Sequence, residues 1–77
     1  QHEPIYGHGR SHPARPIIRE TLVPILERHR VDLHLSAHDQ NYERTYPLTH
    51  RAENGGRVPV VGSQDRCQYP DWTGVVY

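Results

Sequence analysis

Cysteine is almost absent from this chain, since Cys67 is the only one among 77 residues. A single thiol excludes a disulfide within the chain, and it also excludes a zinc site built from several cysteines. So little cysteine indicates neither an oxidising nor a reducing compartment.

Lysine is missing altogether, and nine arginines balance nine acidic residues to a formal net charge of zero. The charges are interspersed along the chain, whereas proteins that bind nucleic acids or membrane surfaces concentrate basic residues. No apolar run approaches the roughly 20 residues that a membrane span requires. The first residues, QHEPIYGHGR, also lack the charged and then apolar layout of a signal peptide. We therefore predict neither nucleic acid nor membrane as a binding partner.

The chain is also short, and its share of apolar residues is low. A chain of 77 residues, of which 34% are hydrophobic, allows at most one small domain. Because a chain of this size buries only roughly 60% of the surface that its unfolded form exposes, the sequence predicts a thin core.

The spacing of apolar residues predicts an amphipathic helix at 16–30. It would begin at a proline, which suits the first helical turn, and a second proline at position 24 is expected to kink or break it. The predicted apolar face holds Ile18, Leu22, Ile25, Leu26 and His29.

Strict alternation of apolar and polar residues predicts a strand at 31–35. Further strands are expected at 57–62 and, as a third candidate, at 73–77. The intervening segments 49–56 and 63–72 are rich in turn-forming residues and are predicted to be loops.

Seven histidines stand out in so short a chain, because imidazole is the commonest metal ligand and titrates near neutrality. His38 follows the predicted strand at 31–35 by three residues, on a loop at the strand's carboxyl end, where open α/β sheets build their sites. His2 lies just before a turn that contains proline, so the two histidines converge on one metal if their strands are neighbours. The alternative is that both are exposed loop histidines.

The stretch VDLHLSAHDQNYERTYP, residues 31–47, resembles a segment of the calcineurin-like metallophosphoesterases. The likeness is strongest to their purple acid phosphatase branch, whose usual form is close to VDLVLSGHDHNYERTYP. Upstream, QHEPIYGHGRSH resembles that branch's H-x-P-x-Y element with its following histidines. The predicted helix and GGRVPVVG fall where the family has a helix and a returning strand. The resemblance covers about residues 1–62, and the tail at 63–77 matches poorly.

The resemblance implies a site with two metal ions, Fe, Zn or Mn, which activate water for in-line attack on a phosphate ester. It makes His2 and His38 ligands of the second metal. His12 matches the histidine that contacts phosphate and protonates the leaving group, with His8 as the weaker contender for that role.

Two departures from the family pattern lie inside the motif. Ala37 stands where the family has glycine, and its β-carbon is unfavourable if the loop needs a positive φ. Gln40 stands where the family has a second histidine, a ligand of the first metal. Because a glutamine carbonyl is a weaker and harder donor than imidazole, Gln40 is a candidate ligand at a weakened site.

The triplet Tyr42, Glu43 and Arg44 could be mistaken for a catalytic acid beside a phosphate clamp. We interpret it as structural support of the loop, because an adjacent acid and guanidinium more readily fix a loop through hydrogen bonds than contact substrate.

The family's other ligands come from elements of the form G-D-x-H, G-D-x-x-D and G-N-H-E, none of which occurs in residues 1–77. Two histidines fall short of the three or more protein ligands that catalytic metal sites use. We therefore expect residues 1–77 to be the C-terminal part of a single metallophosphoesterase domain. In fold it would be an incomplete α/β sandwich of two sheets flanked by helices, inactive without its N-terminal remainder.

The alternative is a truncated or degenerate homologue without catalysis, which binds one metal weakly or serves as a structural or interaction module. The sequence itself indicates no compartment, whereas the resemblance implies a secreted or periplasmic protein with a phosphate ester as its substrate.

Overall fold

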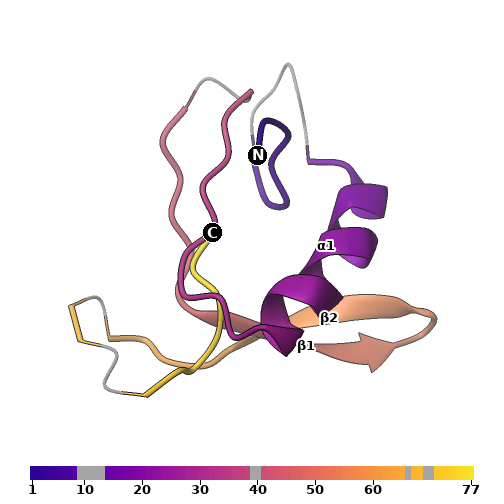
Figure 1. Cartoon of the computed structure of the whole chain (residues 1–77). Helices are drawn as coiled ribbons and strands as arrows, with labels where there is room; N and C mark the ends of the chain where they lie inside the picture. The colour runs from indigo at the N-terminus through magenta and orange to yellow at the C-terminus, as the bar shows by residue number, and fades with distance from the viewer. Residues whose placement is uncertain (9–13, 39–40, 66, 69–70) are drawn as a thin grey trace.

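The computed structural model describes residues 1–8, 14–38, 41–65, 67–68 and 71–77. Within them it contains one helix, α1 (Pro16–Arg28), and an antiparallel pair of strands, β1 (Leu48–Glu53) and β2 (Gly56–Val61). Figure 1 shows the N-terminal segment between α1 and the chain at 31–38, with the hairpin below α1 in this view. The described part is a small α/β protein with a single two-stranded sheet, and it does not show the predicted two-sheet sandwich.

Helix α1 confirms the predicted helix but ends at Arg28 instead of residue 30. Beyond it Arg30 adopts a positive φ of 50°. Its N–H donates to the Glu27 carbonyl (3.0 Å), and the N–H of Val31 donates to the Leu26 carbonyl (3.0 Å). This is the Schellman arrangement that satisfies the last carbonyls of a helix, and it explains the early end.

The interior and the buried face of α1 differ from the prediction. The helix runs through Pro24 without a break. Val23 is its fully buried residue, whereas Ile25 is 51% exposed and His29 is also exposed. The prediction that Ile25 and His29 belong to the covered face is therefore wrong.

The hairpin formed by β1 and β2 confirms one predicted strand and corrects one predicted loop. β2 covers nearly the segment predicted at 57–62, but β1 lies largely within 49–56, where a loop was expected. The two strands pair from Leu48 opposite Val61 to Glu53 opposite Gly56. The turn between them has positive φ at both central residues, Asn54 (49°) and Gly55 (80°), as a tight hairpin requires.

The predicted strands at 31–35 and 73–77 do not form a regular ladder. Leu33 makes an isolated parallel bridge to Val76, and Leu48 makes an isolated antiparallel bridge to Val75. The N–H of His34 donates to the Val76 carbonyl at 2.8 Å, and the Leu48 and Val75 backbones exchange two bonds of 2.9 Å. The segment at 75–77 thus lies between the 31–35 segment and β1.

The core is small, as the composition predicts. The buried hydrophobic side chains in the described ranges are Ile5, Val23, Leu48, Val75 and Val76. Close approach of the 75–77 segment to β1 depends on Gly74, whose φ is 142° and where a β-carbon would lie 2.5 Å from the Leu48 carbonyl. Among the described helical residues, no stretch is long and apolar enough to cross a bilayer.

Candidate functional site

The structure brings together His2 and His38, the two histidines that the sequence singled out as ligands. The Nε2 atom of His2 lies 3.0 Å from the Nδ1 atom of His38, and the ring centroids are 4.7 Å apart with the planes tilted by 57°. The two residues are 36 positions apart in the chain. Their juxtaposition is therefore a product of the tertiary fold.

Backbone hydrogen bonds place both histidines. The Ala37 N–H donates to the His2 carbonyl at 2.9 Å, and the amino group of Gln1 donates to the Leu35 carbonyl at 3.0 Å. His38 itself has a φ of 72°, in the left-handed region that side chains rarely adopt. The positive φ that the sequence led us to consider at Ala37 thus occurs one residue later. Such backbone strain is characteristic of ligand sites.

The distance between the two nitrogen atoms fits shared coordination of one metal ion. With metal–nitrogen bonds of about 2.0–2.1 Å, two cis ligands lie about 2.9 Å apart at a right angle and about 3.4 Å apart at the tetrahedral angle. The separation of 3.0 Å lies inside this range. Two neutral imidazoles that share one N–H⋯N hydrogen bond have the same separation, so the geometry suits both a metal pair and a hydrogen-bonded pair.

A third ligand is not found near the pair within the described ranges, which hold no group of three or more His, Cys, Asp or Glu side chains able to bind a metal. Gln40 and His12, the other predicted site residues, lie outside the described residues. His8 is described, and its side chain is 94% exposed. It pairs with Glu43 and not with the two histidines.

Glu43 joins the N-terminal segment to the loop at 41–45. Its carboxylate accepts hydrogen bonds from the His8 backbone N–H (2.9 Å) and from the Asn41 side-chain amide (2.6 Å), and the His8 ring nitrogen Nδ1 lies 3.4 Å away. The His8 backbone N–H, followed by the Asn41 amide, lowers the pKa of Glu43. Its neighbour Tyr42 is 88% exposed and Arg44 is also exposed. Glu43 thus ties the N-terminal segment to this loop, and the loop-supporting role of the whole triplet stays a prediction.

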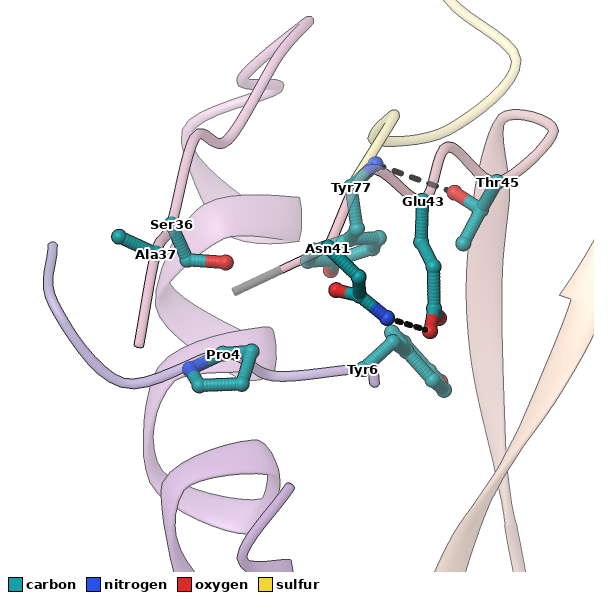
Figure 2. A pocket seen from close by; sticks show the side chains of 8 residues that line it. All are labelled: Pro4, Tyr6, Ser36, Ala37, Asn41, Glu43, Thr45 and Tyr77. Atoms are coloured by element: carbon teal, nitrogen blue, oxygen red, sulfur yellow. Dashed lines mark hydrogen bonds between the residues drawn. The ribbon is translucent and has the colours of Figure 1, made fainter. Parts of the chain in front are cut away.

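A small polar pocket lies beside the histidine pair. Its volume is about 60 Å³, and it is lined by Pro4, Tyr6, Ser36, Ala37, Asn41, Glu43, Thr45 and Tyr77. Figure 2 shows the Asn41 side chain reaching the Glu43 carboxylate and the Tyr77 backbone reaching the Thr45 hydroxyl across this region. A more open depression on the same loop includes His38 and shares Ser36, Ala37 and Asn41 with it. The pocket therefore reaches the loop that carries His38.

Sequence reasoning missed a partly buried polar chain that runs from Glu27 through His50 to Tyr6. The His50 side chain is completely buried, its Nδ1 atom lies 2.6 Å from a Glu27 carboxylate oxygen, and its Nε2 atom is hydrogen-bonded to the Tyr6 hydroxyl. Burial raises the pKa of Tyr6. No local pattern marks these residues, because they come from α1, β1 and the N-terminal segment.

Comparison of the chain with models of protein families, with curated proteins and with solved structures found no match. The resemblance to metallophosphoesterases therefore depends on the sequence pattern of residues 1–62 alone.

Proposed function

We propose that this chain supplies His2 and His38 as two imidazole ligands of one metal ion in a metal-dependent phosphoester hydrolase. The observation that carries the proposal is the 3.0 Å separation of their ring nitrogens. The same two residues occupy the ligand positions of the phosphoesterase motifs that the sequence resembles. The motif thus supports this pair as ligands, and the distance between the two rings is compatible with that role.

The donor set suits Fe, Zn or Mn, for which imidazole is a common ligand. A pair of such ions, when bound, polarises a phosphoryl oxygen and makes water nucleophilic at neutral pH. His2 and His38 would hold one of them, and Gln40 is a candidate donor to the other. His12 remains the proposed proton donor to the leaving group, ahead of His8, whose ring lies against the Glu43 carboxylate.

A second candidate function is a homologue without catalysis that binds one metal weakly. The observation in its favour is that the described ranges present two clustered ligands and no group of three, whereas catalytic sites generally use at least three protein ligands. The coding sequence upstream of Gln1 separates the two functions. Intact aspartate, asparagine and histidine elements there would favour the enzyme, and their erosion would favour the second candidate.

Metal titration tests the proposed site. We expect Co²⁺ to bind the 77-residue chain with visible absorption bands, and Zn²⁺ to displace it. His2→Ala and His38→Ala should each weaken binding by at least tenfold, because each removes half of the imidazole pair. His29→Ala is the matched control, since His29 is exposed at the end of α1 and remote from the pair in the chain. Equal affinities for the chain and all three variants would refute the site.

A further inference from the structure

The partly buried chain of Glu27, His50 and Tyr6 joins three parts of the molecule that are otherwise separate in sequence. His50 belongs to β1, Glu27 to the last turn of α1, and Tyr6 to the N-terminal segment. The His50 side chain has no exposed surface in the folded chain, so its ring nitrogens are bonded to Glu27 and Tyr6 and not to bulk solvent. Each hydrogen bond of this ring is therefore costly to lose.

The chemistry of the three groups sets the direction of the hydrogen bonds. An ionised Glu27 carboxylate can only accept, so the Nδ1 atom of His50 carries the proton of that bond. In the neutral ring the Nε2 atom is then an acceptor, and the Tyr6 hydroxyl donates to it. In either direction, the bond between the Tyr6 hydroxyl and the His50 ring holds Tyr6 in position.

The Arg19 guanidinium and the Tyr77 ring also hold Tyr6 in place. The Arg19 guanidinium lies 4.4 Å from the centroid of the Tyr6 ring, and its Nη2 atom donates to the Ile5 carbonyl at 3.4 Å. Tyr77 packs edge-on against the ring of Tyr6 at 5.2 Å. Tyr6 is therefore surrounded by partners on its ring face, its ring edge and its hydroxyl.

The N-terminal segment at 1–8 contains neither helix nor strand, so its place depends on its contacts with the rest of the chain. These include the contacts of Tyr6 and the Gln1–Leu35, Glu3–Arg15 and His8–Glu43 bonds. Ile5 is buried and Tyr6 is held by His50, while at the other end the His2 carbonyl accepts the Ala37 N–H. Only three residues separate Tyr6 from His2. The backbone of three residues is therefore the route by which Tyr6 could act on the position of His2.

We propose that Glu27, His50 and Tyr6 form a positioning chain that sets the metal affinity of the His2 and His38 pair by holding the N-terminal segment in place. The inference rests on the metal-binding role proposed above. None of the three residues touches the histidine pair in the described contacts, so they act through the backbone of segment 1–8 and not as ligands.

The test uses Tyr6→Phe, which removes the hydroxyl and keeps the ring, and two changes at Glu27. Glu27→Leu removes the acceptor for His50, whereas Glu27→Gln keeps a carbonyl oxygen that can accept its N–H. Glu20→Leu is the matched control, since Glu20 lies on the same helix, is exposed and pairs with Arg57 at 3.7 Å. Both glutamates act electrostatically on Tyr6, so Glu20→Leu also controls for the loss of a nearby negative charge.

Two amide protons report the result by hydrogen exchange. The Ala37 N–H, bonded to the His2 carbonyl, reports the docking of the N-terminal segment, and the Val75 N–H, bonded to the Leu48 carbonyl, reports the core. Tyr6→Phe and Glu27→Leu should lower the protection of Ala37 by about tenfold, the effect of losing one buried hydrogen bond, and leave Val75 unchanged. Zn²⁺ affinity should fall by a similar factor, and Glu27→Gln should restore both.

The outcomes separate this inference from the proposed function. Unchanged Ala37 protection and Zn²⁺ affinity in Tyr6→Phe would overturn the positioning chain, and so would an equal loss of protection at Ala37 and Val75, which indicates a general loss of stability. If the unsubstituted chain binds no Zn²⁺, the proposed function fails, and with it the metal-affinity part of the inference. The Ala37 measurement then still decides whether the chain positions His2.

Discussion

At the scale of single residues, Glu43 connects parts of the chain that are 35 positions apart. The sequence indicated a loop-fixing role for the triplet that contains it, because an acid next to an arginine is typical of such loops. It could not indicate that the backbone of His8 is the partner, since nothing in the local pattern of either segment specifies which loops meet. In the same way His2 and His38 could be named as candidate ligands from sequence, but the 3.0 Å between their ring nitrogens is a property of the fold.

The lowered pKa of Glu43 gives a pH prediction. Because the His8 backbone N–H favours the ionised carboxylate, this contact stabilises the folded chain above the ordinary pKa of glutamate and is lost as the pH falls through the lower, folded-state pKa. We expect the amide resonance of His8 to shift with a midpoint below about 4.3, the ordinary value, in an NMR titration. Glu43→Gln should abolish this shift, and a midpoint at or above the ordinary value would contradict the prediction.

At the scale of elements, the turn of the hairpin allows a matched pair of substitutions. Gly55 has a φ of 80° with no atom within 4 Å of an added β-carbon, whereas Gly56 has an ordinary φ and meets only the Glu53 carbonyl at 3.8 Å. Gly55→Ala should lower the free energy of unfolding by about 1–2 kcal/mol through backbone strain alone, and Gly56→Ala should change it little. Urea denaturation followed by circular dichroism measures both, and an equal effect of the two changes would contradict this account.

For the helix and for one of the two strands, the sequence pattern is enough to predict the element. Helix α1 and strand β2 follow from apolar spacing, and the Asn54–Gly55 pair is itself a hairpin signal; giving it more weight would have predicted β1. The alternation at 31–35 was interpreted as a regular strand, but the structure forms a single bridge there. Leu33 and Leu35 are 54% and 72% exposed, so the apolar side of this segment has little cover within the described part of the chain. Periodicity can predict which face of a strand is apolar, but it cannot predict whether a neighbouring strand is present to pair with that strand.

At the scale of the whole molecule, the small core and the two-ligand site lead to a prediction about activity. Because catalytic metal sites generally use three or more protein ligands, we expect the 77-residue chain with added Mn²⁺, Zn²⁺ or Fe²⁺ to show no hydrolysis of p-nitrophenyl phosphate above the rate of free metal. Metal-dependent turnover that disappears in His38→Ala would show that the chain forms a working site by itself. Turnover that persists in His38→Ala would instead indicate a contaminating phosphatase.

The position of the 75–77 segment between Leu33 and β1 also limits the order in which the chain can fold during its synthesis. During translation, residues 31–35 and the hairpin both leave the ribosome before Val75 and Val76, the residues that bridge them. Until those two valines emerge, Leu48 lacks the backbone partner that it has in the folded chain. The core that Val75 and Val76 complete can therefore close only after this region of the chain has been synthesised.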